Sequence, residues 1–398
     1  MSKLSFYCLI YLLPQICFGF LNGKLGRLDL SSSISGSYDS NLFGVSKDEF
    51  QILKNTKDIE SDDDFIIKFS PVVHYSKKVS LLNFGVNAGF ELAEYIFNNN
   101  RSYLIPTTDI ILDFDDTLSK SKTFSNNAKI RFSANFDIGQ NIGTDLIEGD
   151  LISYTYFKAG FDIRYNHSPK FGVSTGTSYS IREYQAGSLN SYYDDFSTLP
   201  ISNNLFYIYS PKLDFFLNYT FQRSKTASTT NDLGNYTSHS FSGGANGQLS
   251  QKLSGQVSLG VTTLSFKNQT SNGKTSLNSS VSLNLSHNQK TTSKVFLTRQ
   301  FSPSARGYLQ LGTTIGYGIT HKLNEKMNGT LGTSYTHSEI SQLGKRPSEI
   351  TQLSLNGGIN HQISRIFSGN LNYEFSNVSR VQSKFNKHVI TATLQGRF

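Results

Sequence analysis

Long stretches of strictly alternating polarity constrain this chain more than any other feature of its sequence. In the last nine residues, apolar or small side chains occupy the even positions from 390 to 398, and polar side chains occupy the odd ones. A period of two is that of a β-strand with one apolar face. The same alternation recurs at 130–138, 213–221, 253–261, 277–285 and 367–375. The chain is therefore predicted to consist of strands.

These alternating runs are long and follow one another closely. Between Arg27 and Phe398 we count about eighteen of them, each roughly ten to fifteen residues long, and we expect no helical segment between them. Strands of soluble proteins average about 5 to 6 residues, whereas tilted strands that cross a bilayer need about 9 to 11. The length of the runs favours a membrane barrel over a soluble sandwich.

The polar face of these runs has the residue types expected of side chains that line a water-filled lumen. Hydrocarbon cannot hydrogen-bond a backbone, so a spanning sheet must close on itself, with apolar side chains facing lipid and polar ones facing a lumen. Ser, Thr, Asn and Gly dominate the polar positions, and only 17% of the residues are charged. We predict an all-β fold, a transmembrane antiparallel up-and-down β-barrel of about 18 strands over residues 20–398, with 16 strands as the alternative.

The connections between the runs differ in length in a regular way. Tight turns are predicted at 75–78, 167–170, 209–212, 250–252, 287–290, 321–324 and 362–365. Longer connections are predicted at 39–64, 183–203, 225–235 and 338–347. Outer-membrane barrels have short periplasmic turns and long extracellular loops. Counted back from a periplasmic C-terminus, all the tight turns fall at the periplasmic end.

The N-terminus has the three-part layout of a secretory signal peptide. Lys3 precedes an apolar stretch at 4–13, and Pro14 ends that stretch before Gly19, after which cleavage is expected. The alternatives are a membrane anchor, for which ten apolar residues are too few, and lipidation at Cys17. Both cysteines, Cys8 and Cys17, lie in residues 1–19, so the mature chain would contain none.

The net charge of +8 does not point to nucleic acid. Proteins that bind nucleic acid concentrate Lys and Arg in a stripe or tail, and here the basic residues are scattered singly. No run of 18 apolar residues is present, which excludes a bundle of transmembrane helices.

Charged residues on the predicted polar faces are candidates for lining the lumen, where they would tune ion preference. These candidates are Lys68, Glu91, Asp109, Asp113, Arg131, Asp137, Lys158, Asp162, Arg164, Arg182 and Glu374, with Arg397 near the C-terminus. Counting Arg397, six bases face six acids. This balance gives no indication of an anion-selective ring, and pairing along the wall is the simpler interpretation.

Motifs that would indicate an enzyme or a metal site are weak. Residues 172–176 match G-x-S-x-G, but Ser174 lies within a predicted strand instead of at a strand-to-helix turn. The acidic runs Asp62–Asp64 and Asp113–Asp116 could hold Ca²⁺ or the cations that bridge lipopolysaccharide, although such runs are usually solvated loops. We expect no enzyme activity, no metal site and no cofactor.

Several short segments resemble one known family. The terminal Phe398, preceded by Ile390, Ala392 and Leu394, resembles the C-terminal signal recognised by outer-membrane barrel-assembly machinery. Residues 38–43 (Tyr-Asp-Ser-Asn-Leu-Phe) and the arginine-bearing segment 301–307 are similar to the putative β-barrel porin 2 family. Some members of that family are associated with exopolysaccharide biosynthesis and export.

The expected function is passive passage of hydrophilic solutes, with saccharides as candidates, through the outer membrane of a Gram-negative bacterium. Two alternatives stay open: a component of exopolysaccharide export, and a structural or adhesive surface barrel with a closed lumen. Expected partners are outer-membrane lipid and lipopolysaccharide, the barrel-assembly machinery and, for the export alternative, a polysaccharide secretion system. The sequence leaves the solute, the oligomeric state and the gating undetermined.

Overall fold

The computed structural model describes residues 21–23, 25–56, 59–115, 130–145, 150–184, 193, 195–227, 232–267, 273–303, 308–341, 347–381 and 383–398. The predicted signal peptide, residues 1–19, lies outside this part of the chain. No helix among these residues is both long and apolar enough to cross a bilayer.

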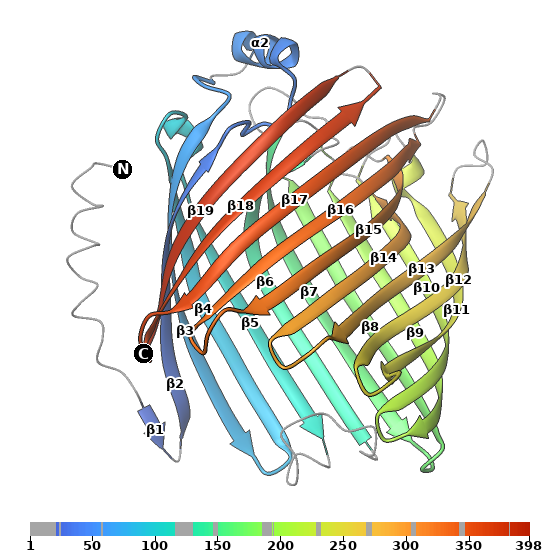
Figure 1. Ribbon diagram of the computed structural model, residues 1–398. Helices are drawn as coiled ribbons and strands as arrows, with labels where there is room; N and C mark the ends of the chain where they lie inside the picture. Colours follow the sequence, from blue (N-terminus) through green and yellow to red (C-terminus); the bar gives the residue numbers. More distant parts are fainter. Residues whose placement is uncertain are drawn as a thin grey trace.

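Antiparallel strands form one closed sheet (Figure 1). They are β1 (Leu21–Gly23), β2 (Gly26–Asp39), β3 (Asp64–Val79), β4 (Leu82–Tyr95), β5 (Tyr103–Asp115), β6 (Ile130–Asp145), β7 (Asp150–Asn166), β8 (Phe171–Tyr184), β9 (Phe196–Ser210), β10 (Leu213–Thr226), β11 (Tyr236–Gln248), β12 (Leu253–Phe266), β13 (Lys274–Ser286), β14 (Thr291–Pro303), β15 (Leu309–Lys322), β16 (Met327–Ser341), β17 (Ser348–Gln362), β18 (Phe367–Arg380) and β19 (Lys384–Arg397).

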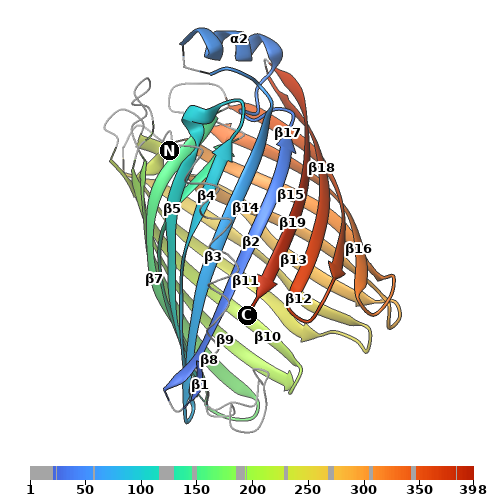
Figure 2. The same ribbon diagram turned by 90° about the vertical axis from the view of Figure 1, so that its left-hand side faces the viewer.

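The barrel itself consists of β2 to β19. Each strand pairs with the next in sequence, and β19 pairs with β2 to close the cylinder, as Figure 2 shows. The short β1 only forms a hairpin with β2. Closure leaves no barrel strand with an open edge, which is what a sheet in hydrocarbon requires. The prediction of a transmembrane barrel of about 18 antiparallel strands is confirmed.

The predicted alternation of short and long connections holds only in part. The turns after β7, β11, β13 and β17 lie where the sequence predicts them. The predicted turn at 75–78 is wrong, because β3 continues to Val79 and the chain reverses at Ser80 with a φ of 55°. At the same end, β5 ends at Asp115 and β6 begins only at Ile130, whereas at the opposite end β18 ends at Arg380 and β19 begins at Lys384.

The predicted connection at 183–203 is also too long. Strand β8 extends to Tyr184 and β9 begins at Phe196, so Ile201 and Asn203 are paired residues of the sheet. Pro200 lies in this part of β9. Its ring removes one backbone donor, yet in β9 it faces Gln222 of β10 without ending the ladder.

An α-helix interrupts the strands, contrary to the prediction. Helix α2 (Lys47–Thr56) lies in the connection from β2 to β3, beyond the end of the barrel that carries the long connections (Figure 1). Ser46 and Glu49 form a capping box: the Ser46 N–H donates to Glu49 Oε2 at 2.8 Å, and the Glu49 N–H donates to Ser46 Oγ at 3.3 Å. The Ser-x-x-Glu pattern was therefore a readable helix start that the strand count overlooked.

Apolar clusters occupy the end of the barrel near α2. Phe43 and Phe50 of the β2–β3 connection pack with Ile66, Ala93 and Tyr95 of β3 and β4. A second cluster joins Leu233 to the ends of β11, β12 and β15, and a third joins the ends of β16 to β19. The packed apolar side chains of the protein therefore lie around one mouth, whereas the middle of the barrel is lined by polar groups.

Candidate functional site: the inner face of the barrel

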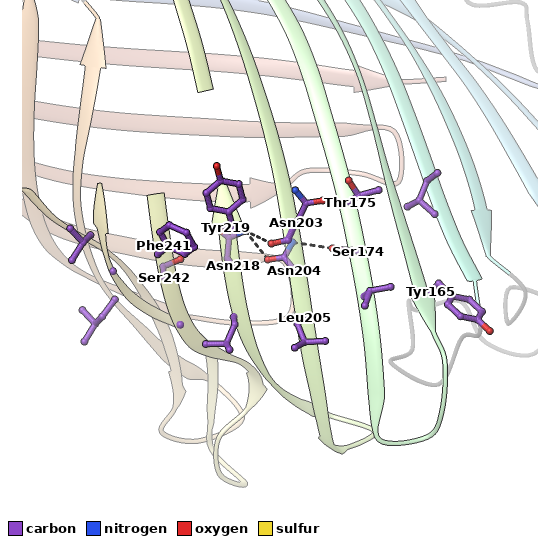
Figure 3. Close-up of a pocket in the computed structure, with 17 residues that line it drawn as sticks. Tyr165, Ser174, Thr175, Asn203, Asn204, Leu205, Asn218, Tyr219, Phe241 and Ser242 are labelled. Atoms are coloured by element: carbon purple, nitrogen blue, oxygen red, sulfur yellow. Dashed lines mark hydrogen bonds between the residues drawn. The ribbon is translucent and has the colours of Figure 1, made fainter. Parts of the chain in front are cut away.

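The direction of each strand's side chains follows from exposure and hydrogen bonding. On β10, Leu217 is 65% exposed, whereas its neighbour Asn218 donates to Ser202 Oγ at 2.7 Å and to Asn204 Oδ1 at 2.8 Å. Asn204 in turn donates to Ser174 Oγ at 3.0 Å (Figure 3). Leu217 and the other exposed apolar side chains of these strands face lipid. Asn218 and the polar side chains that alternate with them face the lumen. The ladder register carries this assignment around the barrel.

Figure 3 also shows a cavity of about 810 Å³ over β7–β12. Outward-facing apolar side chains line much of this cavity, among them Leu205, Leu217, Phe241 and Leu259. These residues belong to the face that meets lipid. We therefore look for a solute path on the inner face instead. Ser174, from the G-x-S-x-G match, lies within β8 and accepts the Asn204 hydrogen bond, so no nucleophile elbow is present there.

The structure places the eleven predicted charged residues in two unequal groups. Ten of them, from Lys68 to Arg182, lie on β3–β8, and Glu374 lies alone on β18. In the register, Asp109 faces Asp137, and Asp137 faces Lys158. Arg131 faces Arg164, and Lys158 faces Ser180. One side of the lumen therefore carries nearly all the predicted charge. The role of these charged residues in ion preference stays a prediction.

Hydrogen bonds on β2–β5 connect charged and neutral groups into chains. Lys68 Nζ lies 3.1 Å from Glu91 Oε1, which also accepts a 2.6 Å hydrogen bond from the Tyr103 hydroxyl. A second chain runs across four strands through Ser31, His74, Asn87 and Asp109, with links of 2.7, 2.6 and 2.9 Å. His74 is thus part of the inner wall of β3.

Further along this wall, several other predicted residues also have neighbours that hold them in place. Asp113 accepts a 2.7 Å hydrogen bond from Ser133 Oγ. The Arg182 guanidinium lies 5.1 Å from the ring centre of Tyr154 and 5.2 Å from that of Phe196. Arg131 and Asp162 line a cavity of about 350 Å³ with Phe206 and Phe216.

A buried ion pair joins β7 to β10. Arg164 Nη2 lies 2.7 Å from Asp214 Oδ2, and the Asp214 side chain is fully buried. Arg164 also donates to Asn166 Oδ1 at 3.0 Å and lies 4.1 Å from the ring centre of Phe206. Asp214 was missing from the predicted set, although its place between Leu213 and Phe215 put it on the polar face of a recognised strand.

The wall formed by β11–β18 is nearly free of charge. Between the first two and last two residues of these strands, the described inward-facing positions carry only Lys294 and Glu374 as charged side chains. Short polar groups bond to one another instead. Asn278 donates to Ser240 Oγ at 2.6 Å and to Thr262 Oγ1 at 2.7 Å. This wall offers hydroxyl and amide groups to the lumen.

The β2–β3 connection is fastened to the barrel mouth by polar contacts. Arg380 of β18 donates to the Gly44 carbonyl at 2.9 Å and lies 3.9 Å from Glu49 Oε2. Burial acts to raise the pKa of Glu49, but the Ser46 N–H and the Arg380 charge outweigh it, so the pKa lies below its ordinary value. Asp64, from the predicted loop carboxylates, is buried and accepts hydrogen bonds from the N–H groups of Ile96, Phe97 and Asn98.

The C-terminal residues predicted to direct assembly lie on the closing strand. Ile390, Ala392 and Leu394 face outward on β19, opposite Tyr38, Gly36 and Ile34 of β2. Phe398 exchanges backbone hydrogen bonds with Leu30, and its ring packs edge-on against Phe367 at 5.9 Å. Their recognition by assembly machinery stays a prediction.

Comparisons with known proteins agree with this architecture. A family model described as putative beta-barrel porin 2 matches residues 118–398. Two crystal structures of OpdK (OccK1) from Pseudomonas aeruginosa, one of them with vanillate, are each 10% identical to this chain with a TM-score of 0.51. Each alignment covers 96% of this chain and 100% of the other. At that identity the likeness concerns the fold alone. No curated protein sequence matches the chain.

Proposed function

Because the chain belongs to the putative beta-barrel porin 2 family, and is thus an outer-membrane porin-like barrel, we propose that it conducts hydrophilic solutes passively and that neutral saccharides are its preferred class. The observation that supports this choice is the wall of β11–β18, whose inward side chains are mostly Ser, Thr, Asn and Gly. Hydroxyl and amide groups exchange hydrogen bonds with sugar hydroxyls as they do with water. Passage along such a wall needs no covalent chemistry, which agrees with the prediction that the protein is not an enzyme.

Liposome swelling tests this proposal directly. Protein purified from outer membranes is placed in vesicles, which are then exposed to isotonic solutions of sugars of graded size and of amino acids of matched mass. We expect swelling with the sugars to be faster than swelling with charged amino acids of similar mass. Absence of swelling with every solute would overturn passive conduction, and equal rates for sugars and charged amino acids would overturn the saccharide preference.

The apolar clusters at one mouth favour a second candidate, a component of exopolysaccharide export. Packed apolar side chains at a pore entrance disfavour water and can hold a channel closed. This alternative predicts a small conductance of the purified barrel in planar bilayers and a larger one when its secretion partner is added. A large conductance of the barrel alone would exclude it.

We further propose that residues 1–19 are a cleaved signal peptide in a Gram-negative bacterium and that residues 390–398 direct barrel assembly. N-terminal sequencing of the mature protein should then begin at Phe20. Removing the side chain of Phe398 should lower the amount of barrel in the outer membrane several-fold, because its ring packs against Phe367 of β18 beside the strand that closes the barrel. An unprocessed N-terminus would contradict the first statement.

A further inference from the structure

We propose that a cavity on the inner face of β13–β18 is an oligosaccharide-binding subsite, in which Phe296 contacts the apolar face of a sugar ring and Lys294 and Glu374 bind sugar hydroxyls at opposite ends. The cavity measures about 560 Å³, and Asn284, Lys294, Phe296, Asn356 and Glu374 are among its lining residues. This inference rests on the proposed conduction of saccharides. It states where in the lumen the saccharide is bound.

The polar residues of the cavity form one row across six strands. In the ladder, Asn284 faces Lys294, Lys294 faces Gly318, and Gly318 faces Gly332. The row continues through Asn356 to Glu374. Five steps between neighbouring strands of about 4.8 Å each give the row a length of about 24 Å. An extended chain of several sugar units would fit along it.

The row is lowest at Gly318, which contributes only backbone. The Asn356 amide lies over Gly332, and Lys294 and Glu374 project long side chains on either side of these positions. In the next row of the ladder, the Phe296 ring lies over Gly316, where an added Cβ would overlap it. Phe296 is half-buried, so part of its ring remains open to the lumen. The result is a trough with an aromatic ring at its side.

The two charges of the trough differ from the paired charges on β3–β10. Within the part of the chain that the structure describes, neither Lys294 nor Glu374 has an ion pair or a side-chain hydrogen bond, and both are exposed. By contrast, Lys68 forms an ion pair with Glu91, and Arg164 forms one with Asp214. Charged groups that the fold leaves free are available to a ligand, and hydrogen bonds to charged groups are stronger than those between neutral ones.

The chemistry of the trough favours a neutral sugar over an ion. Lys294 and Glu374 cancel in net charge, so the site attracts neither anions nor cations as a whole. Asn284 and Asn356 both donate and accept hydrogen bonds, as sugar hydroxyls do. Phe296 offers an apolar surface to the C–H groups of a pyranose ring. An apolar face with converging polar groups around it is the usual build of a small-molecule site.

Single-channel recording with maltohexaose as the probe tests the site. In the wild-type barrel we expect the sugar to interrupt the current. In Phe296→Ala the interruptions should become about tenfold shorter, because the stacking surface is lost. In Lys294→Met and Glu374→Gln they should shorten by a smaller factor of about three. Conductance without sugar and heat-modifiable migration on gels show whether each variant is a folded barrel.

Phe216→Ala is the matched control, because Phe216 is also an inward-facing ring that lies over a cross-strand glycine, Gly244, but lies outside the trough. Its interruptions should last as long as those of the wild type. Equal shortening in Phe216→Ala and Phe296→Ala, or conductance without any interruption by sugar, would overturn the subsite and leave the channel intact. A wild-type barrel that conducts nothing would overturn the proposed function itself.

Discussion

The two sides of the lumen are built on different principles. On β2–β8, acids and bases lie near one another, and many of them are bonded to one another or to Asn, Ser and Tyr. On β11–β18, short neutral groups bond among themselves, and the two charges away from the strand ends stand free. On β2–β8, charged side chains are held by contacts within the protein. On β11–β18, the polar surface is open to solute.

This difference indicates where a solute is recognised. A charge that already has a partner loses that interaction when it turns to a solute, so a paired wall shapes the electric field without binding strongly. A wall of free hydroxyl and amide groups binds weakly at many points, which suits passage. Four variants can break or sharpen this comparison, and they follow in order of decreasing effect.

The largest effect should come from the buried ion pair between β7 and β10, at the border of the charged wall. Asp214→Ala leaves Arg164 as a buried charge without its carboxylate, and we expect a loss of about 3–5 kcal/mol in the free energy of unfolding. Because the chain has no Trp, urea unfolding is followed by gel migration or Tyr fluorescence. Asp109→Ala is the control on the charged wall and should lose at most about 1 kcal/mol. Equal losses in both variants would contradict a special role for the buried pair.

The next effect concerns packing on the neutral wall. Gly316→Ala forces a methyl group against the Phe296 ring, which should lower the free energy of unfolding by about 1–2 kcal/mol and move the ring into the lumen. Gly318, one row away, has only the Leu331 carbonyl oxygen at 3.7 Å from an added Cβ. Gly318→Ala should therefore be nearly neutral. Urea unfolding of the two variants measures the difference, and a neutral Gly316→Ala would show that the ring does not need the glycine.

A smaller effect should appear in ion preference. Asp109 and Asp137 face each other on the charged wall, so the double variant Asp109→Asn, Asp137→Asn removes two negative charges at one level of the lumen. We expect the ratio of cation to anion permeability to fall roughly twofold. Reversal potentials in a KCl gradient measure this ratio. The conservative Glu374→Asp variant on the opposite wall keeps its charge and should leave the ratio unchanged; a shift of similar size there would contradict the assignment.

The smallest effect lies at the mouth and depends on pH. The pKa of Glu49 is lowered in the folded state, so its contacts stabilise the docked connection above the unfolded pKa and are lost as the pH falls through the folded one. Amide exchange of residues 46–56, corrected for its intrinsic pH dependence, should therefore speed up below about pH 4. In Glu49→Gln this increase in the amide exchange rate at low pH should be absent. A rise of the same size in the variant would rule out Glu49 as its cause.

The sequence determined the barrel because a period of two, sustained over runs long enough to cross a bilayer, has few structural solutions. It also determined which face of each strand is polar, and so indicated the ten charged residues on β3–β8. Helix α2 was missed because its ten residues are short beside the strands, although Ser46 and Glu49 marked its start. The connection at 183–203 was predicted too long, because β8 and β9 extend into it at both ends.

The tertiary structure alone decided which residues meet across the lumen. Arg164 and Asp214 are fifty residues apart in sequence and form a pair at 2.7 Å only because the folded sheet places β7 and β10 within reach of each other. The row from Asn284 to Glu374 likewise exists only in the ladder register, since each residue comes from a different strand. Alternation along a strand is a local property that sequence records, whereas alignment between strands depends on closure of the whole cylinder.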